Sequence, residues 1–298
     1  MIVNYPRMRR RVKGWPDDLD TALEFSSANP FSISAPKKWD GKLKYTNGSG
    51  WKTWDGSTIA SGEIENHHCI YLRGIGNSKI TGVNSSNAKW NIIGTNIACN
   101  GDIDLLLDYS TVKSGNRPTL ADRCYAYMFW GCTSLTAAPS LPATTLANDC
   151  YSFMFWGCTS LTAAPSLPAT TLANNCYYSM FQNCTSLTAA PSLPATTLKT
   201  NCYRSMFRDC TSLTAAPSLP ATTLASSCYQ YMFDGCTKIK LSTTASGTYT
   251  KPYRIPKIGT GTTALNALYD MFADTGGTFR GTPEINTTYY LDESNTIV

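Results

Sequence analysis

Ten of the twelve cysteines fall in two series with a fixed spacing, and this spacing constrains the fold more than any other feature of the chain. Within each series consecutive cysteines are 26 residues apart, and the two series are offset by 8 residues. The first series is Cys124, Cys150, Cys176, Cys202 and Cys228, and the second is Cys132, Cys158, Cys184, Cys210 and Cys236. Because a disulfide framework has no such period, the cysteines indicate an internal repeat.

The repeat unit reads C-Y-x-x-M-F-x-x-C-T-S-L-T-A-A-P-S-L-P-A-T-T-L-A-x-x and occurs five times, starting at Cys124. The last copy loses the pattern after Cys236, and residues 267–275 resemble a degenerate terminal unit. Repeats of this length are typical of solenoids, in which each unit buries its apolar side chains only against its neighbours. The sequence therefore predicts a solenoid over residues 99–298, including N- and C-terminal capping segments.

The spacing inside a unit predicts one short helix and one short extended segment. In the second copy, the apolar residues at positions 150, 151, 154, 155 and 158 follow the stripe of a helix with 3.6 residues per turn. Asn148 or Asp149 is the expected N-cap, and Gly157 is the expected end. Residues 161–168 are expected to be extended, because their two prolines cannot continue a helix. One helix and one strand per unit is the architecture of a leucine-rich repeat.

The repeat cysteines are expected to be reduced, buried and apolar in character. The two cysteines of one unit would lie ~12 Å apart along a helix. Equivalent cysteines of neighbouring helices would lie ~8–10 Å apart, beyond the ~7 Å Cα separation that a disulfide spans. No histidine and no C-x-x-C pair accompanies them, so a zinc site is not predicted. The redox state of Cys69 and Cys99, outside the repeats, is left open.

One run of the repeat, Met-Phe-Trp-Gly-Cys-Thr-Ser-Leu-Thr-Ala-Ala-Pro-Ser-Leu-Pro-Ala-Thr-Thr-Leu-Ala from Met128, resembles the 26-residue repeat of BspA-like leucine-rich-repeat surface proteins. The resemblance covers roughly residues 110–275, and residues 101–108 are similar to the segment that introduces such arrays. It implies adhesion or host-matrix binding by bacteria of mucosal habitats, and related arrays occur in phage-encoded proteins. The family supplies no catalytic residues that could be carried over to this chain.

The N-terminal part has a different pattern, in which hydrophobic residues alternate at 23/25, 31/33, 43/45, 70/72 and 90/92, separated by turn-forming clusters. Short alternating strands at this spacing predict a small antiparallel β-sandwich, immunoglobulin-like in size, over residues 21–98. Residues 1–20, with the basic run Arg9-Arg10-Arg11, are predicted to form an arm or linker. The predicted fold class is therefore α+β: an immunoglobulin-like sandwich followed by a leucine-rich-repeat solenoid.

Composition and charge describe a folded chain with a weakly charged exterior. Only 15% of the residues are charged, and the net charge of +5 is mild, so no specific nucleic-acid ligand is expected. No stretch approaches the ~20 apolar residues of a membrane span, and the N-terminus lacks the apolar core of a secretory signal peptide. The expected location is extracellular-facing, on a bacterial cell surface or on a phage particle.

Catalytic and cofactor motifs are not found in the sequence. The only histidines, His67 and His68, are adjacent in a strand-like run, where neighbours point to opposite faces, so they predict neither a metal site nor a catalytic base. The chain lacks GxSxG, Walker A, HExxH and a complete dinucleotide loop. Asp149, Asp209 and Asp234 occur singly and do not predict a glycosidase pair. No cofactor, no metal and no enzymatic activity are expected.

Differences between the copies indicate a candidate binding surface. The segment from Thr133 to Leu146 is identical in four copies, whereas variation concentrates on the expected helix, outside its apolar stripe. The variable columns carry aromatic residues and arginines, which are typical of binding hot spots. The candidate ligand-binding residues are Trp130, Trp156, Tyr127, Phe153, Tyr178, Arg204, Arg208 and Tyr231. Alternatively, exposed positions drift between copies, or the rings only cover the helix end.

A threonine ladder is expected on the extended face, where it either hydrogen-bonds a glycan or only solvates an edge. Its members are Thr136, Thr162, Thr188 and Thr214. Together these features predict a non-enzymatic binding or adhesion protein whose partner is a host or bacterial surface protein or glycan. The alternative is a structural phage protein of a tail, fibre or capsid decoration, attached to other virion proteins through residues 1–20. An enzyme is the third, least supported possibility.

Overall fold

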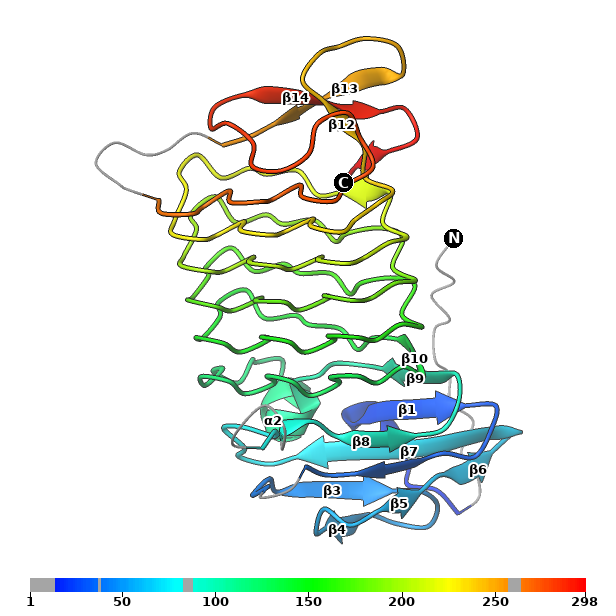
Figure 1. The fold of residues 1–298 in the computed structure, drawn as a ribbon. Helices are drawn as coiled ribbons and strands as arrows, with labels where there is room; N and C mark the ends of the chain where they lie inside the picture. Colours follow the sequence, from blue (N-terminus) through cyan, green and yellow to red (C-terminus); the bar gives the residue numbers. More distant parts are fainter. Residues whose placement is uncertain (1–13, 37–38, 83–87, 257–263) are drawn as a thin grey trace.

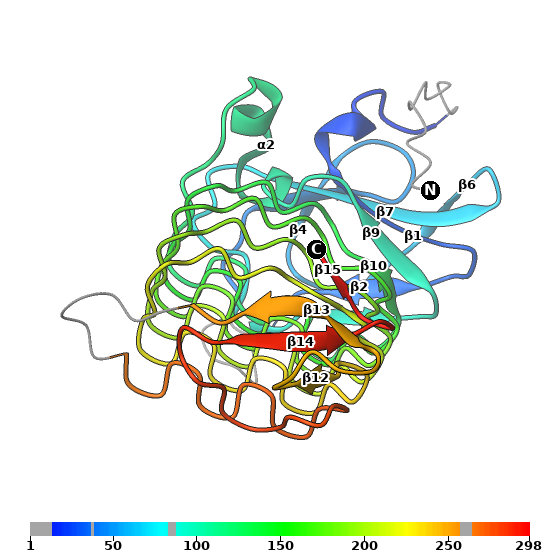
Figure 2. The same cartoon turned by 90° about the horizontal axis from the view of Figure 1, so that it is seen from above.

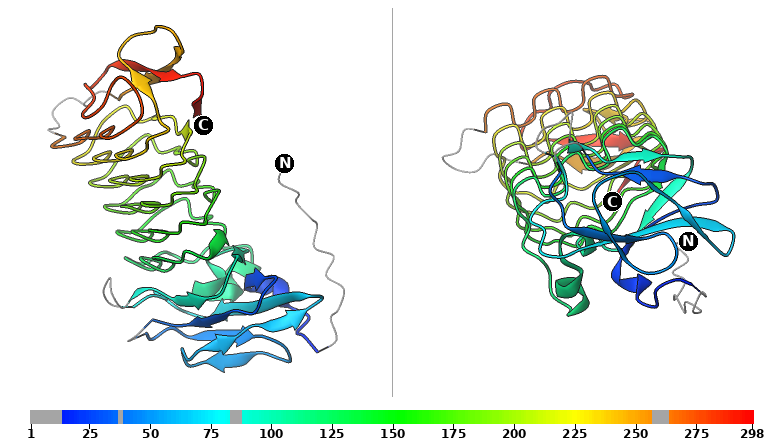
Figure 3. Two further views of the ribbon diagram at one scale, coloured as in Figure 1. Left: turned by 45° about the vertical axis from the view of Figure 1, so that its right-hand side comes forward. Right: turned by 90° about the horizontal axis from the view of Figure 1, so that it is seen from below.

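The structure is a computed structural model that describes residues 14–36, 39–82, 88–256 and 264–298. The repeats form a stack of coils between a β-sheet region at the N-terminal end and a small sheet at the C-terminal end (Figure 1). Seen along the stack, successive coils lie over one another (Figure 2), and from the side they are evenly separated (Figure 3). Of the predicted arm, residues 1–13, with the basic run, lie outside the described residues.

One side of every coil is a series of consecutive tight turns, which we call the turn run. The turn runs are residues 122–131, 148–157, 174–183, 200–209 and 226–235, followed by a last one at 265–274. Within a run, alternate N–H groups donate to the carbonyl three residues earlier, as Met154 does to Tyr151 at 3.2 Å. The intervening N–H groups donate to the next coil, as Phe155 does to Met180 at 2.9 Å. This alternation satisfies the backbone donors and ties each coil to its neighbour.

Every fourth residue of a turn run has a left-handed backbone conformation. In the third coil φ is 56° at Asn175, 51° at Ser179 and 61° at Asn183, and the equivalent residues of the other complete coils share this conformation. The backbone geometry therefore repeats every four residues. This period brings one apolar pair into the core per turn, such as Met180 with Phe181.

The helix predicted for each repeat is therefore wrong, and so is the predicted leucine-rich-repeat solenoid of alternating helices and strands. Over nine residues, a period of four differs little from the 3.6-residue period of a helix, so the apolar pattern fitted both. The distinguishing signal was the left-handed column, where Asn, Asp and Gly tolerate positive φ. Its members are Gly131, Gly157, Asn183, Asp209 and Gly235.

The other side of each coil is extended without forming a continuous sheet. Two prolines per unit lack the N–H that a ladder needs, and the coils are joined there by isolated parallel bridges such as Thr145 with Thr171. The strands of the repeats are β10 (Leu135–Ala137) and β11 (Ala215–Ala216). The sheets of the described residues are thus several and small, and none runs along the stack.

Most of the N-terminal strands belong to one sheet with the order β10-β9-β1-β7-β3-β4, in which β6 also pairs with β7. A second sheet has the order β5-β2-β8. The strands are β1 (Leu23–Ser27), β2 (Ser32–Ser34), β3 (Leu43–Thr46), β4 (Lys52–Trp54), β5 (Ile59–Ala60), β6 (Gly62–Ile64), β7 (His67–Gly74), β8 (Asn91–Ile93) and β9 (Ile97–Asn100).

The predicted immunoglobulin-like sandwich is also wrong. On one edge β9 pairs antiparallel with β1, and on the other it pairs parallel with β10 of the first repeat, so the large sheet continues into the stack. The second sheet consists of strands of only two or three residues, too small to form half of a sandwich. The alternating pattern predicted strands but could not show which of them pair. The predicted domain boundaries at residues 20 and 98 stay predictions.

α2 (Leu105–Lys113) lies against β7 next to the first repeat. A Cβ at Gly74 would lie 1.8 Å from the carbonyl oxygen of Leu106, so only glycine permits this approach. η1 (Leu19–Thr21) contacts α2, and it is held by Arg73 of β7, which donates to Asp18 at 2.5 Å. Both connections fix these short elements against β7.

The C-terminal cap consists of β12 (Leu241–Ser242), β13 (Tyr249–Arg254) and β14 (Thr288–Asp292), in the order β12-β14-β13. The last strand, β15 (Thr296–Ile297), returns to the side of the stack and pairs parallel with β11. Asn295 holds this return, because its side-chain amide donates to the carbonyls of Thr214 at 3.1 Å and Lys238 at 2.8 Å. β15 thus occupies the place of the extended segment that the fifth repeat has lost.

The interior of the stack consists of columns of identical side chains. In one column, Phe129, Phe155, Phe181, Phe207 and Phe233 stack with ring centroids 5.4–5.8 Å apart. The other is formed by Tyr125, Tyr151, Tyr177, Tyr203 and Tyr229 at 5.6–5.8 Å. Phe25 and Phe272 continue the phenylalanine column into the two caps.

All twelve cysteines, including Cys69 and Cys99, are buried thiols outside any disulfide bond. In the second series each thiol from the second copy onward donates to a backbone carbonyl of the preceding coil, as Cys184 does to Phe155 at 3.1 Å. The expected separation of 8–10 Å between equivalent cysteines was wrong. Coils joined by backbone hydrogen bonds are spaced like strands, at ~4.7–4.9 Å. Burial, rather than distance, therefore keeps these thiols inert.

Thiol labelling tests this burial. Desolvation raises the pKa of Cys176 and Cys184 to about 12, so the reactive thiolate is scarce at neutral pH. The native protein is expected to react with Ellman's reagent far more slowly than the denatured protein, in which all twelve thiols react. Rapid reaction of several thiols in the native protein would contradict the packing.

Substitution of Asn183 distinguishes a turn run from a helix by the sign of the effect. At a φ of 61°, alanine should be less stable than glycine by about 1 kcal/mol, because Cβ disfavours the left-handed region. In a helix, alanine would be the more stable by about 1 kcal/mol. Urea unfolding of Asn183→Gly and Asn183→Ala measures the difference. Greater stability of the alanine variant would contradict the turn run and support a helix.

Candidate functional site

The eight predicted binding residues all lie on turn runs, are half-buried and form two groups. We call the first group the aromatic ladder and the second the arginine group. The aromatic ladder consists of Trp130, Trp156, Tyr127, Phe153 and Tyr178, and Arg204 lies at its end. The arginine group contains Arg208 and Tyr231. The prediction therefore selected residues that the fold brings together.

The rings of the aromatic ladder contact one another across three coils. Tyr127 and Phe153 stack with centroids 4.8 Å apart and an interplanar angle of 6°. Phe153 meets Tyr178 at 4.8 Å in an edge-to-face arrangement. The two tryptophans lie 5.3 Å apart, and Trp130 also contacts Tyr127 at 6.5 Å. The ladder is thus one connected surface feature.

The variation between copies in this region is coupled. In each of the first four copies, one of two adjacent positions carries a large side chain and the other a small one. These positions are 126/127, 152/153, 178/179 and 204/205. In the first two coils the large residue is Tyr127 or Phe153, whereas in the third it moves back by one position to Tyr178. The small partners Ser152 and Ser179 are buried. Independent drift of exposed positions does not produce such compensation.

Two rings of the ladder occupy strained backbone positions. Tyr127 has a φ of 63° and Phe153 a φ of 56°. For residues other than glycine and asparagine the left-handed region costs about 1–2 kcal/mol. Aromatic residues at these positions therefore give up stability that glycine would retain, and such outliers cluster at functional sites.

Cationic groups lie at both ends of the ladder. The ammonium group of Lys89 lies 5.3 Å from the centroid of Trp130, and the guanidinium of Arg204 lies 5.5 Å from the centroid of Tyr178. Within the described part of the chain, no carboxylate lies within ion-pair distance of Arg204, and its buried Nε has no hydrogen-bond partner. Sequence reasoning missed Lys89, because it precedes the repeats and no periodic signal marks it.

The arginine group is internally neutralised. Arg208 lies over the ring of Tyr231 at 5.5 Å and pairs with Asp234 at 2.9 Å and Asp209 at 3.7 Å. Their sequence positions had indicated that these two aspartates are isolated, but in the fold both lie against Arg208. Burial raises the pKa of Asp234, and Arg208 opposes that rise. Tyr269 of the last coil, also missed from sequence, contacts Tyr231 edge to face at 5.6 Å.

Three of the four hydroxyls of the predicted threonine ladder, those of Thr136, Thr188 and Thr214, donate to backbone carbonyls. The hydroxyl of Thr136 donates to the carbonyl of Ile97 at 3.2 Å, and that of Thr214 donates to the carbonyl of Thr188 in the preceding coil at 3.2 Å. These hydroxyls connect the coils to each other and the first coil to β9. They support the extended side rather than offering free donors to a glycan.

His67 and His68 lie at the beginning of β7, the first exposed and the second half-buried. Among the residues that the structure describes, no group of three or more His, Cys, Asp or Glu side chains could hold a metal ion. The same residues include no helix with the length and apolar character needed to span a bilayer.

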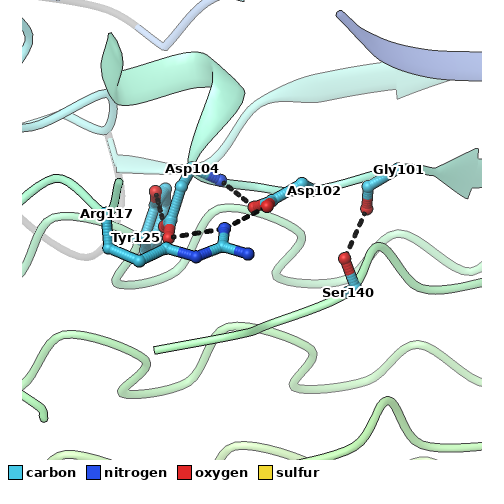
Figure 4. A network of polar contacts seen from close by, with 6 residues as sticks. All are labelled: Gly101, Asp102, Asp104, Arg117, Tyr125 and Ser140. Carbon is cyan, nitrogen blue, oxygen red and sulfur yellow. Dashed lines mark hydrogen bonds and ion pairs between the residues drawn. The ribbon is translucent and has the colours of Figure 1, made fainter. Parts of the chain in front are cut away.

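A buried polar network joins the segment before α2 to the first repeat (Figure 4). Tyr125 donates to Asp104 at 2.8 Å, and Arg117 contacts the carboxylates of both Asp102 and Asp104. The second oxygen of Asp104 is buried without a hydrogen-bond partner. Burial raises the pKa of Asp104 to about 6, and the Tyr125 hydroxyl opposes this rise.

No protein-family model matches the chain, and neither the curated proteins nor the solved structures contain a match to it. The geometry of the two groups on the turn runs is accordingly the basis for a functional assignment.

The network makes stability depend on pH. Because the folded-state pKa of Asp104 is raised to about 6 from its ordinary value of 3.8, the folded protein holds this proton more tightly than the unfolded chain. The contribution of this carboxyl group to the free energy of unfolding is therefore largest below pH ~4. It falls by at most about 3 kcal/mol as the pH rises to ~6. Asp104→Asn keeps the acceptor for Tyr125 and should gain stability relative to the wild type between pH 4 and pH 8. Urea unfolding of both proteins across this range measures the gain. A stability difference that does not change with pH would contradict the raised pKa of Asp104.

Proposed function

We propose that the protein is a non-enzymatic binding protein that presents the aromatic ladder to a protein or glycan of a host or bacterial surface. In this proposal the protein is located on the exterior of a bacterial cell or of a phage particle. The resemblance of the repeat to BspA-like leucine-rich-repeat surface proteins, proposed here as a relationship in sequence, supports the same function.

The observation that carries the proposal is the continuous half-exposed ladder, two rings of which occupy strained positions. Tyrosine and tryptophan supply large contact areas at little cost in side-chain entropy, and together with arginine they dominate binding hot spots. Tyr127 and Phe153 keep their rings despite positive φ. A surface selected only for solubility and stability would favour glycine or asparagine there.

The titratable groups also favour binding over catalysis. Asp104, whose pKa is raised to about 6, has a side chain only 1% exposed, inside the network with Arg117. The hydroxyl of Tyr125 is likewise buried. Near the ladder, Asp149 is paired with Arg123 at 3.8 Å. A catalytic acid or base needs access to substrate, which the buried groups lack.

Truncation of the tryptophan pair tests the proposal. The double variant Trp130→Ala and Trp156→Ala should reduce binding to a mucin and surface-protein array by at least about tenfold, as expected for hot-spot aromatics. Gln182→Ala is the matched control, because Gln182 occupies the equivalent position in the next coil and is also half-buried. Equal binding by the double variant and the control would overturn the assignment. Turnover of any polysaccharide or peptide would overturn its non-enzymatic part.

A further inference from the structure

We propose that the ligand of the aromatic ladder is an acidic protein segment in which carboxylates alternate with aromatic side chains. This inference rests on the proposed function and specifies the ligand class of the same surface. Three observations carry it: the way the rings cover each other's faces, the unpaired guanidinium at the end of the ladder, and the neutralised state of the nearest acidic groups.

Several rings of the ladder have one face covered by a neighbouring ring or by a cation. Tyr127 and Phe153 cover each other by parallel stacking, and Phe153 is in edge-to-face contact with Tyr178. The guanidinium of Arg204 lies over Tyr178, and Lys89 lies over Trp130. The edge of an aromatic ring carries partial positive charge and its face partial negative charge. Covering these faces leaves the positive edges and the hydroxyl groups of the two tyrosines with a larger share in contacts to a ligand.

This polarity selects against neutral sugars. The C–H groups of a sugar carry partial positive charge and pack on the negative face of a ring, and one such face is already covered at Tyr127, Phe153, Tyr178 and Trp130. Carboxylate oxygens and the faces of other aromatic rings, by contrast, are attracted to positive edges. A peptide with acidic and aromatic side chains offers both groups.

The charges around the ladder point the same way. Arg204 lacks a carboxylate partner within the described ranges, and its Nε is buried without an acceptor. Asp149, whose charge acts on Tyr127 of the ladder, pairs with Arg123 at 3.8 Å. An incoming carboxylate would therefore gain a charge-assisted hydrogen bond to Arg204 without displacing an existing partner. Arg208 does not offer this, because Asp234 and Asp209 already hold it.

The test uses the full chain and four labelled polymers in binding titrations. The probes are a random glutamate–tyrosine copolymer, a lysine–tyrosine copolymer, hyaluronan as an anionic glycan and dextran as a neutral one. The expected result is preferential binding of the glutamate–tyrosine copolymer, weakened by added salt. Arg204→Gln and Tyr178→Ala should each weaken this binding by about tenfold.

The control for charge is Lys199→Gln, which removes one cation from the same repeat at an exposed position away from the ladder and should leave binding unchanged. Thermal unfolding of each variant verifies that it is folded. Equal or tighter binding of hyaluronan or dextran would overturn the acidic-peptide assignment, and so would insensitivity to Arg204→Gln. If Trp130→Ala with Trp156→Ala leaves every probe unaffected, the proposed function itself fails.

Discussion

The hydrogen bonds between consecutive turn runs determine the rest of the structure. Alternate N–H groups of a run point along the stack, and each finds a carbonyl of the next coil, as Tyr177 finds Cys202 at 3.1 Å. These bonds bring the coils to the spacing of neighbouring strands, which is shorter than the distance between packed helices. At that spacing, identical side chains must lie directly above one another. The tyrosine and phenylalanine columns follow from it, because flat rings of successive coils stack at 5.4–5.8 Å.

The sequence predicted what lies inside this stack better than how the backbone encloses it. The apolar residues of each unit are buried, as their spacing indicated, and the cysteines lie outside any disulfide bond. The predicted helix failed because the pattern spans little more than two turns, over which periods of 3.6 and four coincide. Residues at 131, 157, 183, 209 and 235, all Gly, Asn or Asp, carried the missing information. The sandwich failed because strand pairing depends on contacts between distant segments, here β9 with β10.

The candidate site was predictable where the repeats could be compared with one another. Aromatic and arginine residues in variable columns identified the ladder, although the reason for their variation lay in the packing. Moving the large side chain from the column of Phe153 to Tyr178 keeps the ladder continuous, because Ser179 takes the vacated position. Lys89 and Tyr269 could not be found this way, since they lie outside the complete repeats. The Asp104 network was equally hidden, because its members come from separate segments.

The return of β15 to the side of the fourth coil has a consequence for how such a chain can change in length. Each internal coil contacts only its two neighbours, whereas both ends are closed by unique segments, β9 at the first coil and Asn295 with β15 at the fourth. A unit of 26 residues inserted between the second and third coils would leave both closures intact and lengthen the exposed side by one rung. A unit inserted after the fourth coil would carry the same extended segment, because residues 211–224 are identical to the corresponding residues of the three preceding copies, and would offer β15 the same partners. Duplication of a unit is therefore compatible with both closures.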